Sequence, residues 1–183
     1  MRARTPFLVV LLSVAAAGPV RGQAPGPRAS GPAIEGFGGV FRVENPDFAT
    51  PMGEYKLVFE VAEGADSPDR LNSHIESLAR FLNMHVQAGV PRENLKLALV
   101  MHGTAAKDAL DQEGYRAKYG MDNPNYDLIQ ALHAFGVQVL LCGQSQMSRG
   151  LPRDRLAPGV KVALSAMTAL AALQNQGYIR VAF

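Results

Sequence analysis

The residue best suited to chemistry in this sequence is Cys142, the only cysteine of the chain. It follows residues 137–141, an apolar run whose branched and aliphatic side chains predict a strand buried on both faces. Gly143 comes next and allows the chain to turn. Open α/β sheets place their reactive groups at the carboxyl ends of strands, so a lone thiol here is a candidate nucleophile. A small buried hydrophobe is the alternative.

A second candidate, His102, follows another apolar run, residues 95–101. We expect it at the same sheet edge as Cys142, where an imidazolium or a following helical turn would lower the pKa of the thiol. A structural histidine bonded at a strand end is the alternative. Backbone N–H groups at the two turns are typical of anion sites. The candidate catalytic residues are Cys142 and His102, and the candidate binding residues are Gly103, Thr104, Gly143, Gln144, Ser145 and Arg149.

Several other kinds of site lack support in the sequence. The remaining histidines, His74, His85 and His133, are not spaced as metal ligands, so we expect no metal site. No glycine-rich nucleotide motif occurs, and we expect no cofactor. Ser145 and Ser165 lack the setting of a serine-hydrolase nucleophile.

The elements that position these residues alternate between strand and helix. A helix over residues 68–88 is indicated by apolar side chains at three- and four-residue spacing, with Ser67 as its cap and Pro68 in its first turn. Residues 104–119 carry a helical pattern broken near two glycines. The other predicted helices span residues 126–135 and 166–175, with one helical turn at 144–148, and the predicted strands span residues 55–61, 95–101, 137–141, 160–164 and 178–182. This alternation predicts an α/β fold, a three-layer α/β/α sandwich on a parallel five-stranded sheet.

The amino-terminal segment has the pattern of a secretory signal. Two arginines precede an apolar stretch of eleven residues, 7–17, which is too short to span a bilayer. We expect residues 1–22 to be removed, with an uncleaved anchor as the alternative, and the mature protein to be periplasmic or secreted. Residues 23–54 then form a disordered leader and an extended arm, and residues 55–183 form the domain. The arm's aromatics, Phe37, Phe41 and Phe48, must pack on this domain or on a neighbouring subunit.

The net charge and the single cysteine limit which partners and which thiol states we expect. Without Arg2, Arg4 and Arg21, the 18 basic residues fall to 15 against 16 acidic ones, a net charge of −1. We therefore expect no nucleic-acid partner, and no membrane insertion once the signal is removed. In an oxidising compartment a single cysteine is a free reactive thiol or an intermolecular partner.

Four segments together carry a family resemblance. They are residues 99–107 (LVMHGTAAK), 123–125 (NPN), 136–145 (GVQVLLCGQS) followed by Arg149-Gly150, and 172–178 (ALQNQGY). In order and spacing the chain resembles the DsrE/DsrF-like family over about residues 55–183, and the secreted members most. That resemblance implies the same α/β/α fold. It also implies a homo-oligomer, a trimer or a hexamer.

The resemblance further implies a chemistry. In sulfur-relay members, a cysteine after the third strand takes sulfur from a donor protein, carries it as a persulfide and passes it to an acceptor, and Cys142 matches that position. Some relatives have a second cysteine three residues on, where this chain has Ser145, which argues against a two-cysteine redox exchange. That relay is cytoplasmic, whereas this chain has the features of an exported protein. Three functions remain open: a sulfur carrier or sulfurtransferase, a non-catalytic module for a small anion or metabolite, and an oligomeric structural protein.

Overall fold

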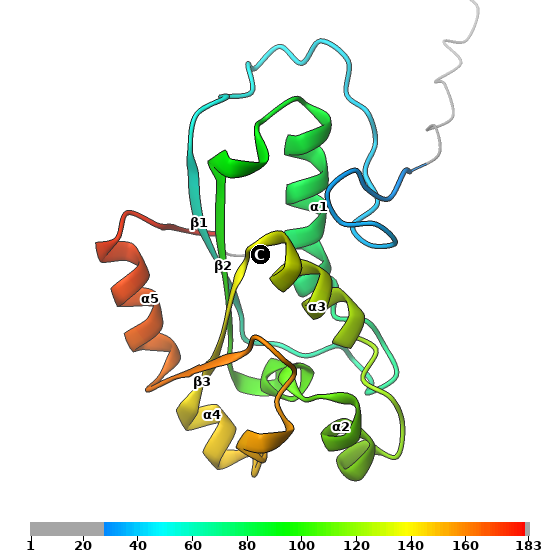
Figure 1. The fold of residues 1–183 in the computed structure, drawn as a ribbon, viewed down its shortest axis with the longest axis vertical. Coiled ribbons are helices and arrows are strands. Elements are labelled where there is room, and N and C mark those ends of the chain that lie inside the picture. Colours follow the sequence, from blue (N-terminus) through cyan, green and yellow to red (C-terminus); the bar gives the residue numbers. More distant parts are fainter. Residues whose placement is uncertain (1–27, 182–183) are drawn as a thin grey trace, which may run out of the picture.

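The computed structural model describes residues 28–181 and contains one parallel five-stranded sheet in the order β4-β3-β2-β1-β5 (Figure 1). The strands are β1 (Tyr55–Val61), β2 (Leu95–Met101), β3 (Gln138–Cys142), β4 (Lys161–Ala163) and β5 (Ile179–Val181). The α-helices are α1 (Ser73–Gln87), α2 (Gln112–Tyr119), α3 (Tyr126–Phe135), α4 (Gly143–Ser148) and α5 (Ala166–Asn175), and the 3-10 helices are η1 (Arg92–Asn94), η2 (Gly103–Ala109) and η3 (Arg153–Arg155). The predicted three-layer sandwich is confirmed.

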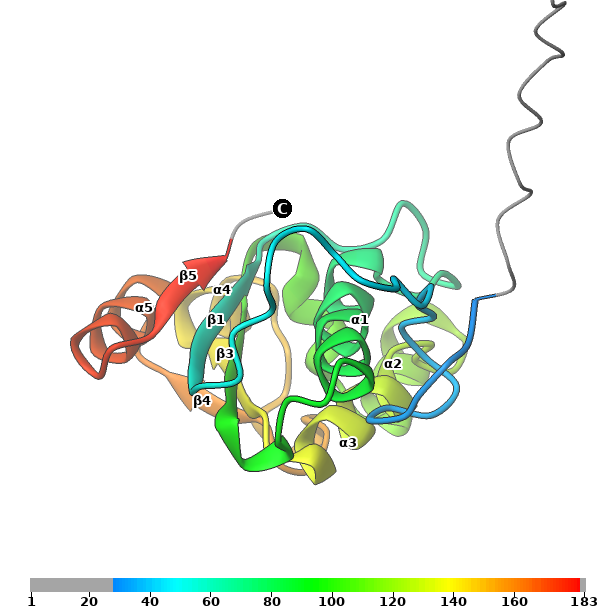
Figure 2. The same ribbon diagram turned by 90° about the horizontal axis from the view of Figure 1, so that it is seen from above.

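Helices cover the two faces of the sheet unequally. Viewed from above, α5 lies on one face, while α1, α2 and α3 lie on the other (Figure 2). The face under α1 and α3 holds most of the buried apolar side chains, among them Phe59, Leu99 and Leu132. The face under α5 holds a smaller cluster that includes Val58, Val100 and Cys142. Burial on both faces explains why β2 is a continuous apolar run broken only by Lys96.

Helix α1 begins at Ser73, so the predicted start at residue 68 is wrong. Its cap is Asn72, whose side-chain oxygen accepts a hydrogen bond from the backbone N–H of His74 at 3.0 Å. Ser67 instead bonds to the nearby Asp69, and the carbonyl of Pro68 accepts from the Tyr115 hydroxyl at 2.7 Å. Tertiary hydrogen bonds therefore hold residues 62–72 as a loop against the local capping signal.

The charged helical pattern at residues 104–119 resolves into two elements. The 3-10 helix η2 leads from β2, and α2 starts after Asp111, whose side chain accepts from the N–H of Gly114 at 2.6 Å. Gly114 lies inside α2, where a Cβ atom would stand 2.7 Å from the Cβ of Arg155. The glycine that breaks the pattern thus marks a close packing contact and leaves the helix intact.

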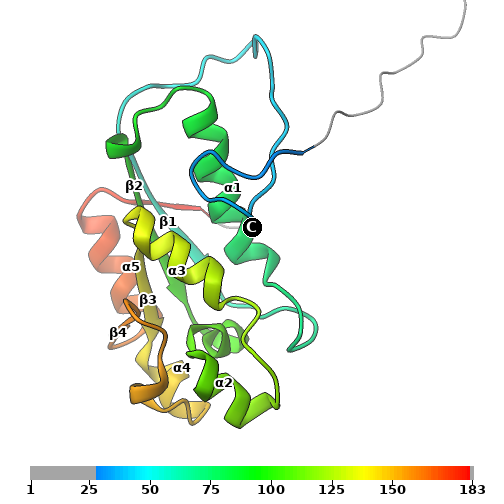
Figure 3. The same cartoon turned by 45° about the vertical axis from the view of Figure 1, so that its right-hand side comes forward.

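The arm at residues 28–40 packs against α1 (Figure 3). Asn83, fully buried in α1, accepts hydrogen bonds from the N–H groups of Ala33 and Ile34 and donates to the carbonyls of Ile34, Phe37 and Gly38. A Cβ at Gly38 would stand 2.4 Å from the backbone nitrogen of Arg80. The first part of the arm therefore belongs to the domain's own core, with Ile34 and Val40 buried.

The predicted signal peptide and the start of the leader, residues 1–27, lie outside the described residues. Across residues 28–181, no helix combines the length and the apolar character needed to cross a membrane.

Candidate functional site

The loops that follow β1 and β2 meet α4 at the carboxyl edge of the sheet. The N–H of Gly64 donates to the Thr104 hydroxyl at 2.9 Å, and the N–H of Gly103 donates to the Ser145 hydroxyl at 3.0 Å. Because α4 follows β3 directly, these bonds join the ends of three neighbouring strands. The sequence-based prediction that Gly103, Thr104 and Ser145 lie at one edge agrees with this geometry.

Cys142 is the last residue of β3 and the cap of α4, one residue further into the strand than expected. Its side chain is buried, with 5% of its surface exposed. Burial raises the pKa of the Cys142 thiol, but hydrogen bonds from the backbone N–H and hydroxyl of Ser145 and from the N–H groups of Ala166 and Gln144 outweigh it, so the pKa is lowered overall. The first turns of α4 and α5 thus supply the donors that favour negative charge on this sulfur.

Two glycines let neighbouring backbone segments pack closely at this edge of the sheet. A Cβ at Gly143 would stand 2.7 Å from the carbonyl oxygen of Ala163 in β4. Gly103 has a φ of +53°, and a Cβ there would stand 2.5 Å from the carbonyl oxygen of Ala62. Neither position accepts a side chain without movement of a neighbouring strand end, which explains why glycine follows both His102 and Cys142.

Ser145 is more than a substitute for the second cysteine of some relatives. Its oxygen accepts the hydrogen bond from Gly103, so its own proton remains available for another acceptor. The same hydroxyl is one of the groups that lower the pKa of Cys142. Ser145 therefore connects the loop after β2 to the sulfur at the end of β3.

His102 lies beside Cys142 in the sheet but is bonded elsewhere. Met101 pairs with Leu141 in the register of β2 and β3, which makes His102 and Cys142 the next neighbours along these strands. The Nε2 atom of His102 is 2.9 Å from Oε1 of Glu60 on β1. Throughout residues 28–181, no hydrogen bond joins the imidazole to the thiol. The imidazole is therefore oriented by a carboxylate on the opposite side from Cys142.

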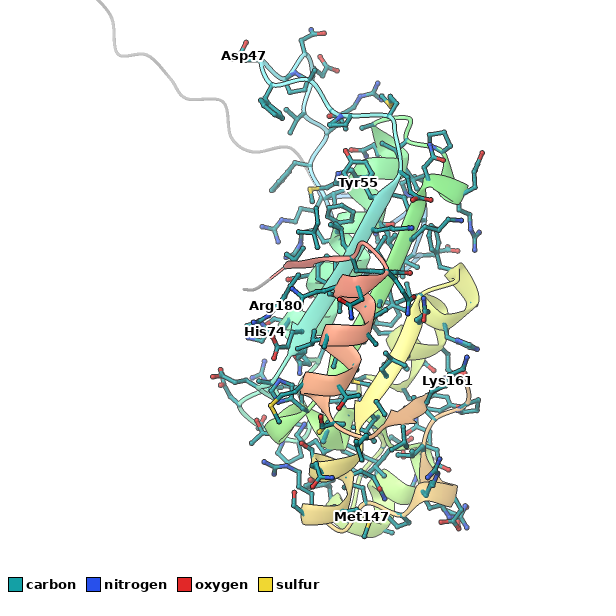
Figure 4. The ribbon with its side chains drawn as sticks, turned by 90° about the vertical axis from the view of Figure 1, so that its left-hand side faces the viewer. Asp47, Tyr55, His74, Met147, Lys161 and Arg180 are labelled. Atoms are coloured by element: carbon teal, nitrogen blue, oxygen red, sulfur yellow. The ribbon has the colours of Figure 1, made fainter. Side chains whose placement is uncertain are left out.

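Glu60 and Arg180 complete this group, and the sequence analysis missed both. Glu60 is hydrogen-bonded to Nε2 of His102 and forms an ion pair with Arg180 of β5, and the Glu60 side chain is only 15% exposed. The stick view shows Arg180 on the side of the sheet covered by α5 (Figure 4). The alternation of β1 offered a signal, because Glu60 is two residues from the buried Val58 and so shares its face.

The side chains of the two other predicted binding residues, Gln144 and Arg149, do not join the group around the thiol. Gln144 is exposed and its side-chain amide donates to the Leu164 carbonyl at 3.4 Å. Arg149 is exposed at the far end of α4 from Cys142, where its carbonyl accepts from Lys118. The structure thus does not bring the Arg149 side chain to the thiol. In the described part of the chain, no three His, Cys, Asp or Glu side chains are grouped as metal ligands.

Exposed apolar side chains lie on the elements that supply the sulfur's donors. Met147 of α4, Leu164 before α5 and Met167 in the first turn of α5 are each more than 70% exposed. The arrangement therefore combines a thiol prepared to carry negative charge with exposed apolar side chains on α4 and at the start of α5.

Comparison with solved structures supports the fold. A protein of unknown function from Methanobacterium thermoautotrophicum is 19% identical, with a TM-score of 0.53 over 71% of this chain and 100% of that one. The ychN protein from E. coli is 25% identical, with a TM-score of 0.51 over 70% of this chain and 99% of that one. No curated protein matches the chain significantly.

Comparison with family sequences gives a match over most of the domain. Residues 56–183 match the family described as DsrE/DsrF-like, and this range contains Cys142, His102, Glu60 and Arg180. The chain belongs to the DsrE/DsrF-like family.

Proposed function

We propose that this protein is an exported sulfur carrier that holds sulfane sulfur as a persulfide on Cys142. Family membership supports a role in sulfur relay. The observation that carries the proposal is the set of hydrogen-bond donors around the buried thiol, which lower its pKa despite burial. The same donors would stabilise the negative charge on a persulfide, whose terminal sulfur is anionic when deprotonated.

The transfer needs no external oxidant. The Cys142 thiolate attacks the outer sulfur of a donor persulfide, R–S–SH, and a new S–S bond forms. The bond between the donor's two sulfurs breaks, and its electron pair leaves on the donor thiolate. An acceptor thiolate then repeats the attack on the Cys142 persulfide and restores the Cys142 thiolate. The N–H groups of Ser145 and Ala166 hold the charge on Cys142 at both ends of the cycle.

The test is intact mass after exposure of the mature protein to thiosulfate or to glutathione persulfide. We expect a gain of one sulfur atom that cyanide removes as thiocyanate, and no gain in Cys142→Ser. The variant should fold normally, since Ser keeps the shape of a side chain at a strand end. Wild-type protein that acquires no cyanide-labile sulfur from either donor would exclude the proposal.

Alkylation tests the state of the thiol separately. Because its pKa is lowered, Cys142 should react with iodoacetamide faster than free cysteine does at about pH 6. His102→Ala should slow the reaction if the neighbouring imidazole contributes. A thiol that reacts only after denaturation is a buried core cysteine, and the carrier function then fails.

Anion binding is the second candidate function, and the convergence of two helix N-termini at one sulfur favours it. Donors from Ser145, Gln144 and Ala166 would hold a small anion as well as a thiolate. This function would be favoured if Cys142→Ser still binds sulfite or sulfate and the wild type transfers no sulfur.

Export is part of the proposal, on the strength of the charged and apolar amino-terminal segment. The mature chain should begin near Gln23. Amino-terminal sequencing of protein from the cell exterior or periplasm checks this, and recovery of the full-length chain in the cytoplasm would contradict it.

A further inference from the structure

A cavity at the amino edge of the sheet is lined by side chains that bind soft metal ions. It has a volume of about 810 Å³ and lies between the last turn of α1 and the loop that precedes β1 (Figure 1). Two thioethers, Met52 and Met84, and one imidazole, His85, line it. Met52 is 51% exposed and Met84 is 43% exposed, so both side chains are open to a ligand from solvent. Thioether sulfur and imidazole nitrogen are ligands that suit copper(I).

The His85 ring is held so that one of its nitrogens is open. Its Nδ1 atom is 2.8 Å from the carbonyl oxygen of Phe81, one turn earlier in α1, and the two rings stack at 3.8 Å between their centres. Because a carbonyl only accepts, Nδ1 carries the proton and Nε2 has a lone pair. Among residues 28–181, no hydrogen bond joins Nε2 to another group. Metal-binding histidines are typically oriented in this way, by a hydrogen bond from the second ring nitrogen.

The two methionines are held close to this ring. Tyr55 lies edge-on to His85, with 4.8 Å between the ring centres. The Tyr55 hydroxyl donates to the carbonyl of Pro51 at 2.9 Å, and Pro51 is the residue before Met52. Met84 directly precedes His85 in α1. All three metal-binding side chains therefore lie around the end of one helix, and unbranched methionine side chains adjust readily to a shared ligand.

The other polar groups of the cavity favour copper(I) over zinc(II). Zinc sites in proteins use thiolates, imidazoles and carboxylates. Among the described residues that line the cavity, Glu44 is the one carboxylate, and it lies 3.9 Å from Arg42 in an exposed ion pair. The thiol of Cys142 lies at the opposite edge of the sheet, at the end of β3. Neutral thioethers and an imidazole match a soft ion that carries a single charge.

We propose that Met52, Met84 and His85 form a copper(I) site. No spacing of histidines predicts such a site, because two of its three ligands are thioethers. The site is separate from the sulfur site, since Tyr55, which contacts the His85 ring, and Met147 of α4 lie toward opposite ends of the molecule (Figure 4). The proposal does not depend on the proposed sulfur chemistry.

The test is a titration with copper(I) against a chromogenic copper(I) chelator under anaerobic conditions. Mature protein with Cys142→Ser is the host for every measurement, because the thiolate is itself a copper(I) ligand. We expect one copper(I) per chain. His85→Gln, Met52→Leu and Met84→Leu should each weaken binding at least about tenfold, since changes next to a metal ligand already cost this much. Met167→Leu is the matched control, because Met167 is an exposed thioether on α5, and its affinity should stay unchanged.

A second measurement identifies the ligands directly. Silver(I), which replaces copper(I) without redox chemistry, should shift the methyl NMR signals of Met52 and Met84 and leave that of Met167 in place. Circular dichroism checks that each variant is folded, as expected for Leu in place of Met. The proposal is overturned if the host protein binds no copper(I), or if its affinity is the same in all three ligand variants. Tighter binding of zinc(II) than of copper(I) also overturns it, because thioethers would then not select the ion.

Discussion

At the carboxyl edge of the sheet, charged side chains are buried on one face and partly exposed on the other. On the face under α1 and α3, Asp108 is fully buried and accepts hydrogen bonds from Lys107 at 2.6 Å and from Asn72 at 2.8 Å. On the face under α5, the hydrogen bond of Glu60 to His102 and its ion pair with Arg180 remain partly exposed. A closed network fixes loops, whereas a network open to solvent can meet a substrate. Under the proposed function, the face under α1 and α3 provides stability and the face under α5 provides the chemistry.

The network on the face under α1 and α3 joins several loops, although the side-chain nitrogen of Asn125 is buried without a hydrogen-bond partner among residues 28–181. Asn72 donates through its side chain to the carbonyl of Glu63 at 2.9 Å, and its N–H donates to the Asn125 side chain at 2.7 Å. Asn123 in turn donates to the carbonyls of Asp108 and Leu110. These bonds join the loops before α1 and α3 to η2, so the carboxyl edge cannot shift as separate loops.

The largest expected effect comes from removing one carboxylate on each face. Asp108→Ala leaves the Lys107 ammonium without its buried partner and should cost about 3 kcal/mol of unfolding free energy. Glu60→Ala should cost roughly 1 kcal/mol or less, because Arg180 is half exposed, but it should slow sulfur loading of Cys142 by releasing the His102 ring. Urea unfolding measures the loss of stability in each variant, and the rate of sulfur loading measures the effect on Cys142. Equal losses of stability would show that the faces do not differ in this way.

A smaller effect is expected at Ser145, which joins the open face to the loop after β2. Ser145→Ala removes one of the groups that lower the pKa of Cys142, so the pH profile of alkylation should move to higher pH. It also leaves the N–H of Gly103 without its acceptor, at a cost of about 1 kcal/mol. Alkylation rates between about pH 5 and pH 9 measure the shift.

The control for this variant is Ser148→Ala, in the same helix. The Ser148 hydroxyl is exposed and donates to the Ser145 carbonyl at 3.3 Å, at the end of α4 away from the thiol. Its alkylation profile should match that of the wild type. If both variants move the profile equally, the effect arises from the stability of α4 and not from the Ser145 hydroxyl.

The sequence predicted the elements whose signals are local. The apolar runs at residues 55–61 and 95–101 are strands β1 and β2 with the expected bounds, because side chains buried on both faces leave a continuous pattern. Helices α3 and α5 also have the expected bounds. The start of α1 was wrong because Asn72, held by residues distant in sequence, replaces the local cap at Ser67.

The candidate site could be predicted only in part, for the same reason. Cys142, His102 and Gly103 were found because each follows an apolar strand. The partner of His102, Glu60, is 42 residues away in the sequence, and so is Gly103 from Ser145. Asn125 stands at the cap position of α3, but its side chain accepts from Asn72 and not from the helix. Contacts between strand ends depend on sheet order, which hydrophobic periodicity does not encode.

The smallest expected effect concerns His85, near the other end of the closed face. Its ring stacks on Phe81 at 3.8 Å between ring centres, and burial lowers its pKa, although the hydrogen bond to the Phe81 carbonyl opposes this. The folded state therefore disfavours the protonated ring. As pH falls from 6.5 toward the folded pKa, the unfolded chain takes up the proton first and stability falls, whereas above 6.5 this loss is absent.

His85→Gln should remove that part of the pH dependence. Urea midpoints of both proteins at about pH 8 and about pH 5 measure it, with His74→Gln as the control. If the urea midpoint changes by the same amount between the two pH values in the wild type and in His85→Gln, the prediction is wrong. Protonation of His85 would then not contribute to the pH dependence of stability.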